Sequence, residues 1–250
     1  MRPVGPPHFV RPSAPQMPRR GGPIQKRRIE HVKKVIVVAS GKGGLAYLTW
    51  TFFGPSIPTL MGLQHSDDPH LTSAGALIPI INHGVPTMSM GYLVPRPPPD
   101  STEFEDVLII DMPPGTGDVP LTLGQLVVVD GAVIVSTPQD VALTDVRRGI
   151  SMFEKISVPI TGLILNQASF LCPSCNTAHE LFGTLANASR LGIPLLAQLP
   201  LVGGVSWGGD RGIPYVLEGK HGGAKDGSAG EMWRDAMNDA ASKIWGLVHS

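Results

Sequence analysis

The sequence predicts a doubly wound α/β domain with a mostly parallel sheet, and three features of the chain lead to this assignment. Short apolar runs rich in β-branched residues recur along the chain, as expected for strands that are buried on both faces. Segments with helical spacing separate most of these runs, which indicates βαβ units. The first run ends at a glycine-rich loop, at the carboxyl end of a strand, where such folds gather ligands. A length of 250 residues fits one domain of this kind.

Five segments are predicted as strands because each is a short apolar run bounded by turn residues. They cover residues 33–40, 106–111, 131–137, 159–166 and 193–200. Four segments with helical spacing are predicted as helices. They cover residues 120–128, 140–156 and 178–192, with a closing helix inside 230–247.

Two segments do not suit this fold. Residues 45–53 form a short aromatic run with no polar face where a helix should follow the first strand, and residues 94–104 form a proline-rich linker where another crossover helix is expected. A βαβ unit needs roughly 30 or more residues, and residues 35–54 are too few to hold one. The sequence therefore predicts a fold that is incomplete at two places.

Charge and hydropathy restrict the partners of the domain. The chain has 20 basic and 20 acidic side chains, so its formal net charge is zero. A balanced chain has no general attraction to nucleic acid or to an anionic membrane. No apolar run reaches the roughly 18 residues that a membrane-spanning helix needs. We therefore expect no nucleic-acid partner and no membrane insertion.

The first 32 residues differ in composition from the rest. Residues 1–29 contain seven arginines and lysines and no acid, together with many prolines. A basic, acid-free leader is typical of a mitochondrial targeting segment, although the prolines would disrupt the amphipathic helix that such a segment forms. The alternative is a disordered tail. We expect a leader over 1–32 and a single domain over 33–250.

The glycine loop at 41–44 begins like a phosphate-binding loop and then departs from that pattern. In such a loop, backbone N–H groups surround phosphate oxygens, a lysine reaches the β- and γ-phosphates, and a hydroxyl holds Mg²⁺. The loop residues are Gly41, Lys42, Gly43 and Gly44. Ala46, Tyr47 and Leu48 stand where the pattern G-K-G-G-x-G-K-[ST] has glycine, lysine and a hydroxyl residue. The loop thus lacks its second cation and its metal-binding hydroxyl.

Asp111 ends the predicted strand 106–111 and is followed directly by the loop "MPPGTGD" at 112–118. A carboxylate at the end of a buried strand is costly unless it meets a cation or hydrogen-bond donors. A role in holding or orienting Mg²⁺ is therefore the favoured hypothesis. The alternative is that Asp111 caps the following turn.

Cys172 and Cys175 are the only cysteines, and they flank a proline and a serine. Two thiolates at this spacing can share a zinc ion, bind one edge of an iron–sulfur cluster, or form a redox disulfide. A four-ligand site needs two more ligands. Either the nearby His179 contributes, or a second copy of the chain supplies a second pair.

Five long segments, taken in order, resemble the Mrp-type, MinD-related P-loop ATPases that carry iron–sulfur clusters, and most closely the mitochondrial members that serve assembly of respiratory complex I. The segments are "VIVVASGKGG", "FGPSIPTLMGL", "VLIIDMPPGTGD", "VIVSTPQDVALTDVRRGISMF" and "CPSC". The resemblance covers about residues 29–217. It implies a P-loop NTPase-like fold and a homodimer in the mitochondrial matrix, with the cytoplasm as the alternative location.

The same resemblance implies a function. The dimer would bind ATP with Mg²⁺ and a [4Fe–4S] cluster, and deliver the cluster to apo-proteins such as complex I subunits. Cys172 and Cys175 match the pair that bridges the cluster between two subunits. Asn166 is similar to the asparagine that reads adenine, and the loop after Pro200 is similar to the base-binding loop.

The resemblance also implies roles around the phosphates. Lys42 is similar to the signature lysine that reaches the phosphates held by the partner subunit, while Gly41, Gly43 and Gly44 line the phosphate loop. Asp111 corresponds to the Walker-B acid. ATPase activity follows from the resemblance only in part, because the second lysine and the Ser/Thr of the loop are missing.

The departures leave alternatives open. The flanking motifs are nearly intact, so the two interruptions have the form that skipped exons would leave. A chain that exists as written is expected to hydrolyse ATP weakly or not at all, and an alternative function is a catalytically dead pseudo-ATPase that binds intact family members. A MinD-like positioning ATPase would need a C-terminal amphipathic membrane helix, and the closing segment has few cations for that.

Overall fold

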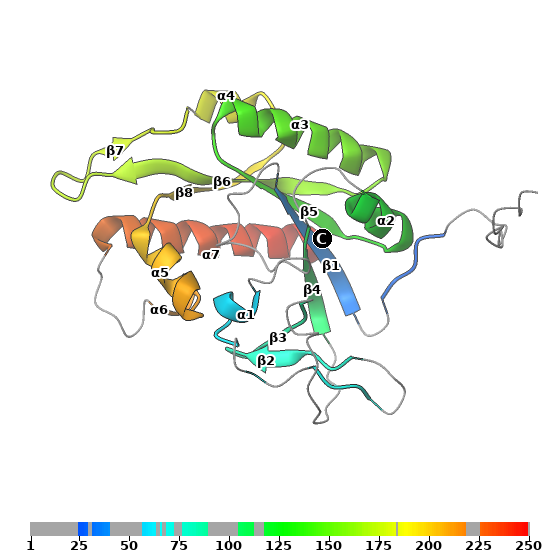
Figure 1. Ribbon diagram of the computed structural model, residues 1–250. Coiled ribbons are helices and arrows are strands. Elements are labelled where there is room, and N and C mark those ends of the chain that lie inside the picture. The colour runs from blue at the N-terminus through cyan, green and yellow to red at the C-terminus, as the bar shows by residue number, and fades with distance from the viewer. Residues whose placement is uncertain are drawn as a thin grey trace, which may run out of the picture.

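The computed structural model describes residues 25–29, 32–40, 57–63, 66, 69–72, 77–89, 105–112, 118–183, 185–218 and 226–249. In these residues a central sheet lies between two layers of helices, as Figure 1 shows. The predicted α/β class with a mostly parallel sheet is confirmed.

The strands of the main sheet come from six segments. They are β1 (Val32–Ser40), β4 (Glu105–Asp111), β5 (Gly131–Ser136), β6 (Ile160–Leu171), β7 (Ala178–His179) and β8 (Leu195–Pro200). A separate antiparallel hairpin consists of β2 (Ile80–Asn82) and β3 (Val85–Thr87). All five predicted strands are present, each within a few residues of its expected start.

The helices differ widely in length. They are α1 (Ile57–Leu60), α2 (Asp118–Leu126), α3 (Asp140–Lys155), α4 (Leu185–Ser189), α5 (Gly203–Arg211), α6 (Tyr215–Glu218) and α7 (Gly227–His249). The predicted helices at 120–128, 140–156 and 230–247 correspond to α2, α3 and α7. The sequence reasoning did not anticipate the short helices α1, α5 and α6.

The strands pair in the order β4-β1-β5-β6, all parallel, with β8 parallel to β6 and β7 antiparallel to the last residues of β6. The pairing is continuous across the described strands. The losses expected at 45–53 and 94–104 fall outside these strands, so the pairing does not test them. In the described sheet β4 pairs with β1 alone, and Ile109 of β4 is 55% exposed.

Alternation along the strands builds two apolar layers, because successive side chains point to opposite faces of a sheet. Val35 and Val37 of β1 belong to the cluster that packs against α3, whose Phe153 is fully buried. Ile36 points the other way, into a cluster that includes Trp233 of α7. Figure 1 shows α3 and α7 on opposite faces of the sheet. Each burial removes a large apolar side chain from water, worth about 1.5–3 kcal/mol for a fully buried one.

The predicted helix at 178–192 is wrong in its first half. Ala178 and His179 pair with Leu171 and Phe170 as the short return strand of a hairpin, and a helix follows only at Leu185–Ser189. The predicted end of the preceding strand at 166 is also wrong, because β6 continues to Leu171. Cross-strand pairing thus decides the conformation of a segment whose own spacing favours a helix.

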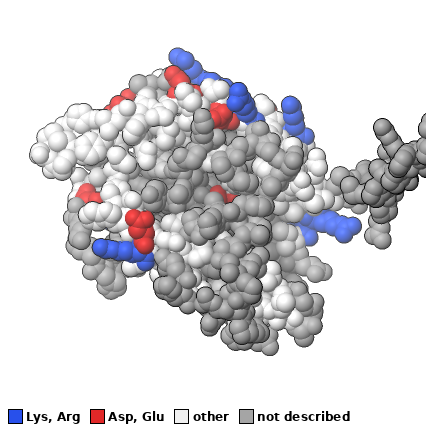
Figure 2. Space-filling model, in the orientation of Figure 1, with Lys and Arg blue, Asp and Glu red and all other residues white. Residues whose placement is uncertain are grey.

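Several expectations concern residues that the structure does not describe. They are the interruptions at 45–53 and 94–104, and the leader at 1–32 apart from residues 25–29 and Val32. In the described residues, no helix is both long enough and apolar enough to cross a membrane. Figure 2 shows acidic and basic side chains interspersed near the rim of the face that it presents.

A backbone contact joins the turn after α1 to the end of α5. Gly212, in the left-handed conformation at φ 70°, ends α5 and meets Gly62, which has φ 64°. The β2–β3 hairpin stabilises this contact through two side chains. Asn82 donates to the carbonyl oxygen of Met61 at 2.6 Å. A ring nitrogen of His83 lies 2.9 Å from the carbonyl oxygen of Gly212. Only residues without a Cβ fit such an approach.

Replacing Gly212 tests this contact. A methyl group at Gly212 would lie 2.1 Å from the Cα and backbone nitrogen of Gly62. We expect Gly212→Ala to lower the free energy of unfolding by about 2–4 kcal/mol, from overlap and left-handed strain together. Gly246→Ala is the control, because nothing lies within 4 Å of its added methyl group and it should stabilise α7 by about 0.5–1 kcal/mol. Urea unfolding measures both, and equal midpoints for Gly212→Ala and the wild type would contradict the account.

Candidate functional site

The predicted phosphate loop lies outside the described residues. Gly41, Lys42, Gly43 and Gly44 all belong to that part. The structure describes the strand that leads to them, since β1 ends at Ser40 in the interior of the sheet between β4 and β5. The loop therefore starts at the carboxyl edge of a central parallel strand, which is where ligands bind in folds of this type.

Asp111 lies beside that starting point. It is the last residue of β4, is 3% exposed, and pairs in register with Val38 of β1. The next residue, Met112, donates its backbone N–H to the carbonyl oxygen of Val38 at 2.8 Å. A nearly buried carboxylate is thus fixed two residues below the end of the strand that enters the glycine loop. The burial that the sequence analysis expected for Asp111 is confirmed.

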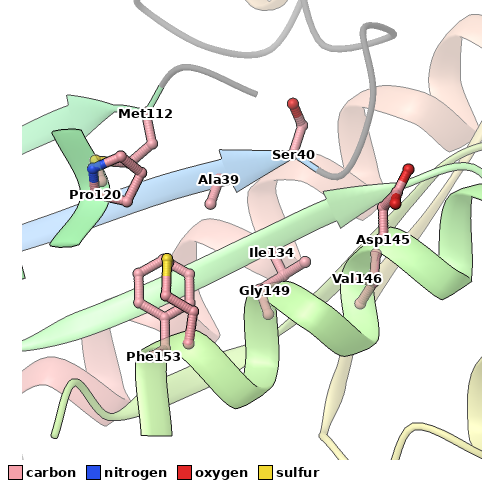
Figure 3. A pocket seen from close by; sticks show the side chains of 10 residues that line it. Ala39, Ser40, Met112, Pro120, Ile134, Asp145, Val146, Gly149 and Phe153 are labelled. Carbon is pink, nitrogen blue, oxygen red and sulfur yellow. The ribbon is translucent and has the colours of Figure 1, made fainter. Parts of the chain in front are cut away.

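A crevice runs beneath the ends of β1 and β4, between the sheet and α3. Figure 3 shows Ser40 and Asp145 at one end of it and Phe153 at the other. Its cavity volume is about 20 Å³, which is room for about one water molecule. This volume is too small for a nucleotide.

A larger hollow opens where β6 separates from β8. Leu165 pairs with Gln198 and Ser169 pairs with Pro200, so two extra residues of β6 bulge out between these pairs. Gln167, inside the bulge, has φ 54° and donates its backbone N–H to the side-chain oxygen of Asn166 at 2.9 Å. The bulge therefore turns Asn166 out of the regular strand pattern. The prediction that Asn166 ends its strand is wrong, because it lies at the bend of a longer one.

The hollow brings together the two segments that the sequence analysis connected with adenine. Its volume is about 240 Å³, close to the lower limit of about 300 Å³ for small-molecule pockets, and so suited to one planar end of a ligand. It is lined by Asn166, Gln167, Pro200, Leu201, Val202, Val205, Ser206 and Trp233. Both Asn166 and the loop after Pro200 therefore line the same space.

A cluster that the sequence did not reveal packs against Trp233, which lines the hollow. Asp226 accepts a hydrogen bond from the Tyr215 hydroxyl at 2.9 Å and one from the Gly204 backbone N–H at 3.3 Å. The Tyr215 ring packs edge-on against Trp233, with 5.3 Å between ring centroids, and the Arg234 guanidinium lies 5.6 Å from its centroid. These residues come from α5, α6 and the start of α7, so no local spacing could connect them.

Burial raises the pKa of Tyr215 to about 12, and the hydrogen bond to Asp226 and the charge of that carboxylate add to the effect. The phenol is therefore a permanent donor at neutral pH, and it holds Asp226 against the first turn of α5.

The two cysteines lie in the turn of the β6–β7 hairpin. Cys172 donates its N–H to the carbonyl oxygen of Thr177 at 3.0 Å and accepts the N–H of Asn176 at 2.8 Å. Asn176 closes the turn with φ 54°, a left-handed conformation that asparagine tolerates. Both thiols are free, and Cys175 is exposed. The hairpin extends past the helices at one side of the molecule in Figure 1.

The turn also favours the thiolate form of Cys175. Hydrogen bonds from the Thr177 hydroxyl, from the Thr177 backbone and from the Cys172 side chain lower the pKa of the Cys175 thiol, while burial opposes them. The thiol lies 3.2 Å from the Thr177 hydroxyl oxygen. Since Cys172 contributes one of these bonds, its side chain lies near the Cys175 thiol. Thiolates are the form that binds metal ions.

His179 is not brought to the cysteines as a third ligand. It lies in β7, opposite Phe170, where the sequence analysis expected the start of a helix. In the described residues, no group of three or more His, Cys, Asp or Glu side chains is close enough to hold a metal ion. One described chain therefore offers two ligands at this turn.

Solved structures define the class of this fold. A nucleotide-binding protein of Archaeoglobus fulgidus, in complex with ADP, is 30% identical with a TM-score of 0.61, over 74% of this chain and 88% of that one. The cell-division ATPase MinD of Pyrococcus furiosus has a TM-score of 0.55, and the match covers 86% of this chain and 99% of that one. At 21% sequence identity, this match shows a shared fold alone. The fold is that of the MinD-like P-loop NTPases.

Sequence relatives narrow the class to a family. The family model described as "ParA: NUBPL iron-transfer P-loop NTPase" matches residues 100–232. The mitochondrial "iron-sulfur protein required for NADH dehydrogenase" of Arabidopsis thaliana is 37% identical over 90% of this chain and 82% of its own length. The "iron-sulfur cluster transfer protein NUBPL" of Mus musculus is 37% identical over 81% of this chain and 76% of its own length. The chain belongs to the NUBPL family of iron-transfer P-loop NTPases, which confirms the resemblance noted in its sequence.

The match to the Arabidopsis relative also reports on length. It runs over 267 residues, more than the 250 of this whole chain, although it takes in only 90% of the chain. The relative therefore has residues within the matched region that have no counterpart here. The sequence analysis expects such losses at 45–53 and 94–104.

The raised pKa of Tyr215 predicts a loss of stability in alkali. The protonated Tyr215 phenol stabilises the folded state fully below its unfolded pKa of 10.0. This stabilisation is lost as the pH rises towards the folded pKa of about 12. We expect the difference in free energy of unfolding between the wild type and Tyr215→Phe to shrink by about 2 kcal/mol between pH 9 and pH 12. Urea unfolding across this range measures it, and a difference that stays constant would refute the assignment.

Proposed function

We propose that this chain is an iron–sulfur cluster carrier that holds its cluster on the paired thiols of the β6–β7 turn. The observation that carries the proposal is the placement of Cys172 and Cys175. Both thiols are free and lie at the tip of a hairpin, with one thiolate favoured by its hydrogen bonds. Metal ligands at such a position are accessible to another protein without unfolding of the domain. Family membership with iron-transfer proteins supports the same role.

The cluster is proposed to lie between two copies of the chain. A [4Fe–4S] cluster takes four cysteine ligands, and the chain contains two. His179 lies on the neighbouring strand outside any ligand group. A second copy related by a twofold axis would supply the missing pair. In this arrangement the cluster is the cargo of the dimer, and its release would need only the separation of two hairpin tips.

The nucleotide is proposed to bind along the carboxyl edge of the sheet, with its adenine in the hollow beside Asn166. A side-chain amide offers both donors and an acceptor to a base edge, and Val202 and Val205 give the hollow apolar walls. Gly41, Lys42, Gly43 and Gly44 would hold the phosphates. Asp111 would orient a Mg²⁺ ion through water, since its burial at the end of β4 requires a cation or donors.

The cargo is proposed to go to apo-proteins of respiratory complex I, in the mitochondrial matrix. The Arabidopsis relative is named as a mitochondrial protein required for NADH dehydrogenase, and the leader of this chain is basic and free of acids up to residue 29. Nucleotide binding would gate the transfer.

A second function is favoured by the residues at 46–48, which replace the catalytic lysine and the hydroxyl of the phosphate loop. A chain with these substitutions would bind nucleotide without hydrolysing it and would act as a partner of intact family members. An ATPase assay separates the two proposals, because turnover above the background rate excludes the second.

Cysteine variants test the carrier proposal. After anaerobic reconstitution with iron and sulfide, the wild type is expected to form a dimer with about two irons per chain, as four thiolates share one cluster. Cys172→Ala and Cys175→Ala should each lose at least about 90% of the iron and the charge-transfer absorbance, because each removes two of the four ligands in a dimer. Ser174→Ala, a change within the same turn, is the control and should load normally. A cluster retained by Cys172→Ala would exclude this site.

Asn166 tests the nucleotide proposal. Removing its amide should weaken ADP binding about tenfold, as expected for the loss of a hydrogen bond to a buried base edge. Calorimetric titration with ADP measures the change in Kd, and Asn238→Ala on α7, remote from the hollow, is the matched control. Equal affinities of the wild type and Asn166→Ala for ADP would contradict the proposal that adenine binds in this hollow.

A further inference from the structure

We infer that the start of α7 connects the hollow to the cysteine turn, with Asp226 and Ser228 as positioning residues for the two ends of the site. The inference rests on the proposed binding of a nucleotide in the hollow, and it adds a path by which that nucleotide acts on the turn. The hollow and the turn lie on different segments, and two hydrogen-bonded contacts from one short stretch reach both.

The first contact fixes the wall of the hollow. The Asp226 carboxylate, one residue before α7, accepts the backbone N–H of Gly204 and the hydroxyl of Tyr215. Gly204 lies between Val202 and Val205, which both line the hollow. The approach is close, because a methyl group at Gly204 would lie 2.2 Å from an Asp226 carboxylate oxygen and 2.4 Å from the Tyr215 ring. A displacement of this wall therefore moves Asp226 with it.

The second contact reaches the turn. The Ser228 hydroxyl, in the first turn of α7, donates to the side-chain oxygen of Asn176 at 3.0 Å. Asn176 closes the turn through its N–H bond to the Cys172 carbonyl oxygen at 2.8 Å. The residue that holds the turn in its left-handed conformation is thus held in place from α7. Figure 1 shows the hairpin and the start of α7 at the same side of the molecule.

The segment between the two contacts is short and well anchored. Asp226 and Ser228 are two residues apart, and Trp233 lines the hollow less than two helical turns further on. Trp233 is 4% exposed and packs against Tyr215. A ligand that contacts Trp233 and Val205, the neighbour of Gly204, therefore bears on both sides of Ser228. Ordering of this segment by a ligand orders the cysteine turn as well.

Hydrogen–deuterium exchange on the full chain tests this connection. We expect ADP to slow exchange of the backbone amides at 172–177 about threefold in the wild type, which corresponds to a modest strengthening of the Ser228–Asn176 bond. Ser228→Ala should abolish this effect. Ser242→Ala is the matched control, since its hydroxyl donates only to the Asn238 carbonyl oxygen further along α7, and it should retain the threefold effect.

Binding measurements give the reciprocal result. Because coupling between two sites is symmetric, Ser228→Ala should weaken ADP binding by the same factor of about three, although the serine does not line the hollow. An unchanged turn in ADP-bound wild type, a retained effect in Ser228→Ala, or no binding of ADP to the wild type would each overturn the inference.

Cluster loading is scored separately from exchange. If the chain loads a cluster on its cysteines but ADP has no effect on the turn, the carrier proposal stands and the connection through α7 is refuted. If ADP slows exchange at the turn but the chain loads no cluster, the connection through α7 stands and the carrier proposal is refuted.

Discussion

The pairing of β6 along both of its edges is the interaction on which the rest of the site depends. With β5 on one side and β8 on the other, the first half of β6 is fixed in the centre of the sheet. That anchoring allows its second half to bulge at Gln167, where a left-handed residue is otherwise unfavourable. The bulge opens the hollow, and the residues beyond it project as the hairpin that carries the cysteines. A single strand thus supplies both Asn166 and the thiol turn.

The segments on the α7 face make hydrogen bonds near both of these features. Asp226, Tyr215 and Gly204 join three helical segments where small residues allow close contact. This cluster is largely withdrawn from water, so its hydrogen bonds are stronger than they would be at the surface. The opposite layer, α3 with Phe153, packs against the sheet through apolar side chains.

The sequence predicted those parts of the fold that depend on residues close together along the chain. Apolar β-branched runs located the parallel strands, and helical spacing located α2, α3 and α7. Residue patterns also singled out Asp111 and the cysteine pair, and the resemblance to a known family singled out Asn166. The sequence-based prediction failed at 178–192, where pairing with Leu171 makes Ala178 a strand residue. It could not reveal Asp226, since the bond to Gly204 depends on how distant helices pack.

The open edge of β4 has a consequence for the behaviour of the chain in solution. In the described sheet β4 pairs with β1 alone, and its Ile109 is largely exposed. An edge strand with an exposed apolar side chain invites the strand of another molecule. This edge lies at the opposite end of the strand order from β6 and its hairpin. Aggregates that grew from β4 would therefore be separate from the proposed cluster-bridged dimers, and a sample that aggregates in this way would still present its thiols.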